Sequence, residues 1–365
     1  MRALVILVLL AATAHAYPQF QLAKDQTCSG CHLSPAGGGL LSENGLGVAG
    51  ATSQWGTAPE FFYGALPTPT WLTLGGDLRG AGGFFDSVEK NAVAFPMQAE
   101  LLANAAFGAF SVHVAAGARD PQYQNTAATL FSTREHWIEW QQDPGSTAGL
   151  FVRAGRFMPV FGLRFVEHPD FTRRYGGSPL YGEAYGVAVE YIAPAWEVHA
   201  TGFIHDPIFP DSVERGNGGA VYAEARLTTT TSVGAETKLD VTPDDRHLYT
   251  GVTAKQWLET PGILVQAEVQ LVHQKVGLGG TNNQLVGYVM GSYFLTDAIM
   301  IDLGLEAYAP DLHVRYLDQE GVDLNVHWFT TSHLEVILTN HFQMQELGEG
   351  GLSSGYSLLQ LHYRL

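Results

Sequence analysis

Hydrophobic and polar residues alternate along most of the chain, in segments of about ten residues separated by Gly, Pro, Asn and Asp. The clearest segment is Ile301–Ala307, and Leu264–Leu271 and Val322–Trp328 follow the same rule. Shorter alternating runs begin at Phe110 and Trp196. Alternation places successive side chains on opposite faces of a β-strand. The pattern therefore predicts an all-β fold with many strands.

This array extends from Trp71 to Leu365 without interruption. At roughly 18 residues for a strand and its connection, it accommodates about 16 strands of a transmembrane outer-membrane β-barrel. The last run, Leu359–Leu365, alternates strictly and ends on an apolar residue, with Tyr363 two positions before the end. This ending resembles the C-terminal signature of bacterial outer-membrane barrels. A soluble β-sandwich is the alternative, but it would not need so long an unbroken array.

In a barrel, one set of alternating side chains faces lipid and the other faces the lumen. The polar set, which we expect in the lumen, contains Glu100, His113, Glu197, His199, Glu268, Asp302, Glu306, Asp323, His327, Glu335 and His362. A lining of acids and imidazoles would concentrate divalent cations and could pass protons. The alternative is that these residues only solvate the wall of a pore. Aromatic girdles are expected from Trp137, Trp140, Trp196, Trp257 and Trp328.

One connection is unusually long and carries several cations. The stretch Gly155–Arg164 leads to His168 and then to Arg173 and Arg174. It is similar to a Gly-Arg-Phe-x-Pro-x-Phe-Gly stretch of phosphate-selective-type porins. We expect a constriction loop folded into the lumen, and an ordinary surface loop is the alternative.

The N-terminus resembles a secretory signal. Arg2 precedes an apolar core, and Ala14-His15-Ala16 matches a small-x-small cleavage site, so residues 1–16 are predicted to be removed. A retained N-terminal anchor is the alternative. No later run of about 18 apolar residues predicts a transmembrane helix.

Composition supports the same picture. Charged residues make up 15% of the chain, below the ~25% usual for soluble domains. Asp and Glu outnumber Lys and Arg by 36 to 19, which argues against nucleic acid as a partner.

The two cysteines of the chain form one motif, Cys28-Ser29-Gly30-Cys31-His32. This order is the attachment sequence of a c-type haem, in which two thiols add to the porphyrin vinyl groups and the next residue ligates the iron. We therefore expect one covalent haem c on Cys28 and Cys31, with His32 as its proximal ligand. A redox-active C-x-x-C pair is the alternative, but no thioredoxin-like βαβ context accompanies it.

The segment that carries the motif, residues 17–69, is too small and too rich in Gly, Pro and Ser to build its own core. It contains no methionine and no second histidine, so the iron is either five-coordinate or ligated from the barrel, residues 70–365. Both options require the segment to dock on or inside the barrel. The candidate sixth ligands are Met97, His113, Met158 and His168.

An export signal, one haem motif and a porin-like barrel, in this order, resemble the fused outer-membrane cytochrome–porins, whose best-known members are ferrous iron oxidases. At the residue level the resemblance rests on Tyr17–Phe20, Cys28–His32, Leu33–Pro35 and Asn44-Gly45. It implies electron transfer from extracellular Fe(II) through the haem to periplasmic c-type cytochromes. The run Pro35–Gly39 departs from that family and is more like a broader group of haem-bearing barrels, a resemblance that implies electron transfer without specifying iron as the donor.

Three functions follow from these observations. The first is electron transfer across the outer membrane, with Fe(II) oxidation as its most specific form. The second is a porin or channel for small solutes or anions, gated or plugged by the haem segment. The third is a haem-based sensor, which would need a five-coordinate iron and a signalling partner. The expected partners are outer-membrane lipid and, by resemblance to porins, two further copies in a homotrimer.

Overall fold

The structure, a computed structural model, describes residues 18–86, 91–119, 131–165, 170–180, 182–204, 216–277, 279–314, 317–347 and 350–365. The predicted signal peptide and His168 lie outside the described residues. Among the described residues, no helix is long and apolar enough to cross a membrane.

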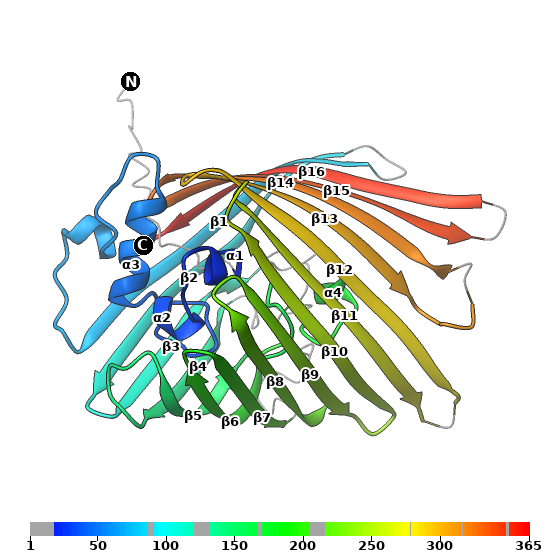
Figure 1. The fold of residues 1–365 in the computed structure, drawn as a ribbon, viewed down its shortest axis with the longest axis horizontal. Helices are drawn as coiled ribbons and strands as arrows, with labels where there is room; N and C mark the ends of the chain where they lie inside the picture. Colours follow the sequence, from blue (N-terminus) through cyan, green and yellow to red (C-terminus); the bar gives the residue numbers. More distant parts are fainter. Residues whose placement is uncertain are drawn as a thin grey trace.

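Sixteen antiparallel strands close into one barrel, in which every strand pairs with its neighbours in the chain and β1 pairs with β16 (Figure 1). The strands are β1 Leu72–Asp86, β2 Asn91–Phe107, β3 Phe110–Arg119, β4 Phe131–Gln141, β5 Gly149–Phe157, β6 Ala184–Ala193, β7 Trp196–Ile204, β8 Asn217–Thr228, β9 Thr231–Val241, β10 Asp245–Leu258, β11 Ile263–Val276, β12 Thr281–Thr296, β13 Ile299–Ala309, β14 Gln319–Thr331, β15 Leu334–Leu347 and β16 Gly350–Arg364. The predicted fold class and the expected strand number are confirmed.

The alternation seen in the sequence is the alternation between lumen and lipid. On β13, Leu303 and Leu305 are exposed on the outer surface, whereas Asp302 and Glu306 are buried. All the acidic and imidazole residues predicted to face the lumen are buried. A closed barrel leaves no unpaired strand edge, and with an apolar outer face it is the structure of an outer-membrane protein. This confirms the predicted location in the bacterial outer membrane.

The prediction for one tryptophan was wrong. Trp196 and Trp328 are exposed at strand ends, as expected of a girdle, but Trp137 is buried in the lumen. Its ring stacks on His113 with the ring centroids 4.6 Å apart. Its position in β4 has the same parity as the buried Glu139, so the strand alternation, rather than the residue type, decides which way it points.

The two ends of the barrel differ. At one end, five connections are only two residues long: 108–109, 194–195, 229–230, 297–298 and 332–333. Short turns mark the periplasmic end of bacterial barrels. The C-terminus lies at this short-turn end, on the left of Figure 1.

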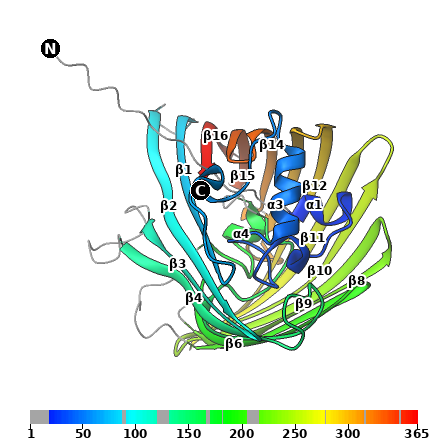
Figure 2. The same cartoon turned by 90° about the vertical axis from the view of Figure 1, so that its left-hand side faces the viewer.

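The N-terminal segment lies in the mouth of the barrel at the short-turn end (Figure 2). It contains the helices α1 Pro18–Ala23, α2 Cys28–Cys31 and α3 Glu43–Thr52 and the short 3-10 helix η1 Phe61–Gly64. Phe20 of α1 packs inside the barrel against Met300 and Phe329. Further along, the backbone N–H of Gln54 donates to the carbonyl oxygen of Phe329, and that of Trp55 to the carbonyl oxygen of Thr330. The N-terminal segment is therefore in direct contact with the inner face and the rim of the barrel.

Polar contacts join the same segment to two of the connections at this end of the barrel. Lys24 forms an ion pair with Asp297 at an N···O distance of 3.1 Å, and the Ser29 hydroxyl donates to the carbonyl oxygen of Thr147 at 2.6 Å. The two connections, between β12 and β13 and between β4 and β5, lie on opposite sides of the barrel rim, so the segment extends across the mouth.

The connection between β5 and β6 is also inside the barrel. Its short helix α4, Phe171–Arg174, lies in the lumen (Figure 1). Leu163 and Phe165 pack against Tyr288 and Met290 of β12, and Phe171 packs in another cluster on the same side of the wall. The prediction that this loop folds into the lumen is confirmed for its described residues.

Candidate functional site

The first four residues of the Cys28–His32 motif form the helix α2. Thr27 caps its N-terminus, and the hydroxyl of Thr27 accepts a hydrogen bond from the Gly30 N–H at 3.0 Å. His32 follows as the C-terminal cap, with extended backbone, and pairs in a β-bridge with Leu41. Cys28 and Cys31 do not form a disulfide. A short helix between the cysteines and an extended residue after them therefore hold the three motif side chains at one place.

Two glycines keep space beside the motif. A Cβ at Gly37 would lie 3.6 Å from Cys28 Sγ and 3.9 Å from His32 Cδ2, and the residue has a φ of +84°. A Cβ at Gly45 would lie 2.0 Å from the carbonyl oxygen of Cys31, so any side chain there would separate α3 from α2. Ser42, which caps α3, donates from its hydroxyl to the Gly30 carbonyl at 2.8 Å.

The motif faces a lumenal cavity of about 300 Å³. Cys28, Cys31 and His32 line it from the segment, and Met97 and Met158 line it from the barrel and the constriction loop. Two of the four candidate sixth ligands are thus brought to the motif. The residues present fit a covalently attached haem: two cysteines, a histidine and candidate thioether ligands share one cavity, and Gly37 leaves room at the sulfur and the imidazole.

The third described candidate, His113, is not among the residues that line this cavity. It lies next to Gly39, where a Cβ would be 3.7 Å from His113 Cε1. The stack of His113 on Trp137 fills the space beside its ring.

Burial governs the chemistry of the two sulfurs as free thiols. It raises the pKa of Cys28, against the lowering effect of the nearby Arg164 guanidinium. It raises the pKa of Cys31 to about 11, and Cys28 adds to the shift. Since thiolates are the nucleophilic form, the free thiols would be poor nucleophiles near neutral pH, which disfavours the alternative of a redox-active pair.

Arginines fasten the motif to the barrel. Arg153 of β5 makes a forked pair with Glu190 at 2.9 and 2.8 Å and donates to the Ser34 hydroxyl at 3.1 Å. Arg164 of the constriction loop donates to the carbonyl oxygen of Ala36 and pairs with Glu197 at 3.3 Å. The segment is therefore anchored to the wall and to the loop by charged donors.

Sequence analysis missed Arg153 and also Arg134, which lines the cavity and pairs with Glu100 at 2.9 Å and Glu183 at 3.2 Å. The alternation of β5 could have placed Arg153 inside, because Phe151 and Arg153 share the buried set. No comparable signal in the sequence identifies Arg134, because the register of the β3–β4 pairing shifts between Ala115 and Ala116 of β3.

The other predicted loop cations have separate surroundings. Arg173 lines the haem-motif cavity. Arg174 instead donates to the Gln343 side-chain oxygen at 3.2 Å, in an exposed position on the opposite wall. The loop cations are thus divided between two parts of the lumen.

Comparison with known proteins supports the fold. No protein-family model matches the chain, and no curated protein matches its sequence. OmpT of Vibrio cholerae has a similar structure, with a TM-score of 0.61 and 15% identity over 82% of this chain and 100% of OmpT. The anion-selective porin of Comamonas acidovorans gives a TM-score of 0.60 and 12% identity over 80% of this chain and 99% of the porin. OmpF of Salmonella typhi gives 0.60 and 10% over 80% of this chain and 97% of OmpF. The chain therefore has the fold of bacterial outer-membrane porins and channels.

Proposed function

We propose that this protein is an outer-membrane electron-transfer barrel that carries one haem c on Cys28 and Cys31, with His32 as proximal ligand. The observation that carries the proposal is the convergence of these three residues with Met97 and Met158 on one lumenal cavity. A haem attached there would supply one-electron Fe(II)/Fe(III) chemistry.

The chain's own residues would hold and tune this site. Arg153 and Arg164 fix the motif segment against the wall, and burial beneath α1 and the constriction loop limits access of water. A lumen of low dielectric favours the less charged form of a buried redox centre, so enclosure would raise the potential. Of the described residues that line the cavity, Met97 and Met158 carry a thioether that could serve as sixth ligand.

The position of the segment suggests the direction of electron transfer. The segment lies in the short-turn mouth, the periplasmic side by the rule for bacterial barrels, which favours a periplasmic c-type cytochrome as one partner. An extracellular donor such as Fe(II) would then reach the lumen from the opposite mouth. On this view the protein acts as a ferrous iron oxidase or accepts electrons from another external donor.

An anaerobic absorption spectrum of the oxidised holoprotein, before and after addition of Fe(II), tests the proposal. We expect c-type haem bands that sharpen on Fe(II) addition and are absent in the Cys28→Ala/Cys31→Ala variant. Reduction by dithionite without reduction by Fe(II) would exclude iron as the donor. A holoprotein without haem bands after dithionite would overturn the electron-transfer proposal itself.

A channel for small solutes is the second candidate, and the likeness to porins taken alone favours it over electron transfer. The α1–α3 segment would then be a plug. Conductance in planar bilayers separates the two functions. A channel conducts equally with and without the two cysteines, whereas an electron conduit loses its redox function in the double variant. Because OmpT has a trimer form, we also propose a homotrimer, which light scattering of the detergent complex would test.

A further inference from the structure

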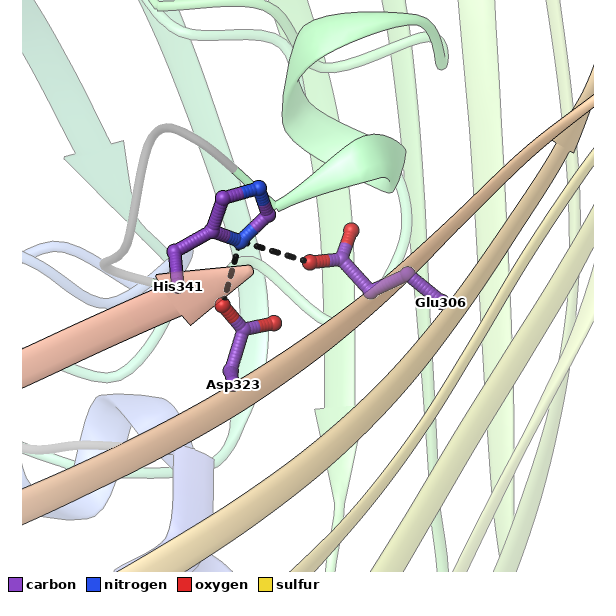
Figure 3. A group of neighbouring side chains, drawn as sticks. All are labelled: Glu306, Asp323 and His341. Carbon is purple, nitrogen blue, oxygen red and sulfur yellow. Dashed lines mark hydrogen bonds and ion pairs between the residues drawn. The ribbon is translucent and has the colours of Figure 1, made fainter. Parts of the chain in front are cut away.

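A second cluster of ligand-type residues lies in the lumen beside α4. Glu306 of β13, Asp323 of β14 and His341 of β15 point toward one another (Figure 3). One potential ligand atom from each lies within 4.8 Å of the others, and all three residues are buried. His341 Nδ1 is 2.7 Å from Asp323 Oδ1 and 3.5 Å from Glu306 Oε1.

The geometry differs from that of the other buried histidines of the lumen. His327 faces Asp302 with Nε2, at 3.1 Å, and Glu335 with Nδ1, at 2.9 Å, so its two carboxylates lie on opposite sides of the ring. In the cluster beside α4, both carboxylates approach the same nitrogen of His341. Among the described histidines, this arrangement leaves a common point that three ligand atoms can share.

The separations match those of a coordinated ion. Ligand atoms about 2.1 Å from a metal are about 3.0 to 3.4 Å apart for right-angled to tetrahedral coordination. The two separations between His341 Nδ1 and the carboxylate oxygens, 2.7 and 3.5 Å, bracket this range. Small side-chain rotations would therefore bring the three donors to bonding distance.

Two carboxylate oxygens of the cluster accept no hydrogen bond from any residue that the structure describes: Glu306 Oε1 and Asp323 Oδ2. Both side chains are more than nine-tenths buried, with 5% and 2% of their surface exposed. A buried carboxylate oxygen without a donor is costly unless a proton or a cation satisfies it. Glu306 Oε1 lies 3.5 Å from His341 Nδ1 and faces the point that the three side chains share (Figure 3).

The far side of His341 is arranged as in metal-bound histidines. Its Nε2 is 3.3 Å from Gln343 Oε1, and Arg174 donates to the same oxygen at 3.2 Å. Because a guanidinium only donates, the Gln343 atom between them is the acceptor, and His341 Nε2 carries a hydrogen. The Nδ1 atom then holds either a second proton or a metal ion, and a hydrogen bond from the other nitrogen is the usual support of a metal-bound histidine.

We propose that Glu306, Asp323 and His341 bind one divalent first-row transition ion. One imidazole and two carboxylates suit Zn(II), Mn(II) or Fe(II) better than Ca(II), which takes oxygen ligands alone. The ion would neutralise the two carboxylates. It would also join β13, β14 and β15 to the constriction loop, since the Phe171 N–H donates to the second oxygen of Glu306. This site is separate from the haem motif and does not depend on the proposed electron transfer.

Equilibrium dialysis of the full-length protein against Zn(II), with zinc and protein counted by mass spectrometry, tests the site. We expect one tightly bound equivalent in the wild type. Replacing a ligand in Glu306→Gln and in His341→Gln is expected to weaken this binding by at least about 10-fold. His327→Gln is the matched control, since it changes an equally buried histidine between two carboxylates, and it should keep the bound equivalent.

Far-UV circular dichroism establishes that each variant forms the barrel. If His341→Gln does not fold, Glu306→Gln still tests the site, because its amide oxygen remains an acceptor for the Phe171 N–H. The site is excluded if the wild type binds no tight equivalent, or if His327→Gln loses zinc to the same degree as the ligand variants. Displacement of the bound zinc by millimolar Ca(II) would contradict the assigned class of ion. None of these outcomes affects the haem proposal, because zinc is counted independently of haem iron.

Discussion

Phe20 is the main apolar anchor of α1, so Phe20→Ala is expected to release the start of the segment from the barrel. The ring is 4% exposed and lies with its centroid 5.7 Å from that of Phe294 and 5.8 Å from that of Phe329. Truncation of a buried phenylalanine to alanine costs about 3 to 5 kcal/mol. Since about 1.4 kcal/mol is a factor of ten, the undocked population should rise by roughly two to nearly four orders of magnitude.

Limited trypsin digestion measures this population directly. Lys24 is the only lysine or arginine between residues 18 and 71, and it directly follows α1. Its ion pair with Asp297 and the helical turn before it must both open for cleavage. When opening and closing are fast, the cleavage rate follows the equilibrium population of the open form.

We therefore expect cleavage after Lys24, followed by mass spectrometry, to be about a hundred-fold or more faster in Phe20→Ala than in the wild type. Phe342→Ala is the matched control, because Phe342 is 48% exposed on the outer face of β15 and should leave the rate unchanged. A rate within about three-fold of the wild type in Phe20→Ala, with the barrel intact, would refute the view that this ring holds the segment in place.

Three further predictions concern the motif and its anchors. Gly45→Ala places a methyl group against the Cys31 carbonyl and should destabilise the segment by about 1 to 3 kcal/mol and lower covalent haem content in a pyridine haemochrome assay, whereas Gly47→Ala, which meets nothing within 4 Å, should not. Arg153→Met should lower the free energy of unfolding in urea by about 3 to 5 kcal/mol, because it leaves Glu190 buried and without its forked partner. Adding Glu190→Met should recover most of this loss, and an unchanged free energy in the single variant would contradict the account. In haem-free protein, the pKa of Cys31 lies above its ordinary value of 9.0, at about 11, so the stabilisation by the bound proton is complete below pH 9 and is lost between pH 9 and 11. The pH midpoint of Cys31 alkylation, followed by mass spectrometry, should therefore be higher in the folded protein than in urea, and equal midpoints would disprove the shift.

The barrel could be derived from the sequence because its signal is local and repeated. Alternation with period two decides which residues face lipid, and it correctly placed Asp302, Glu306 and Asp323 inside the barrel. The same rule predicts that Trp137 faces the lumen, and the error arose where residue type was preferred over parity. The motif Cys28–His32 could likewise be identified, because its chemistry depends on adjacent positions.

Which residues meet inside the barrel was decided only by the tertiary structure. Barrel closure and the inward loop bring Met158 to the motif and leave His113 outside its cavity, although both were equal candidates from the sequence. In the same way, Glu306, Asp323 and His341 come from three different strands, and their meeting depends on the register of β13, β14 and β15. The physical reason is that alternation specifies a face but not a partner: register, closure and loop packing are set by contacts between residues far apart in the chain.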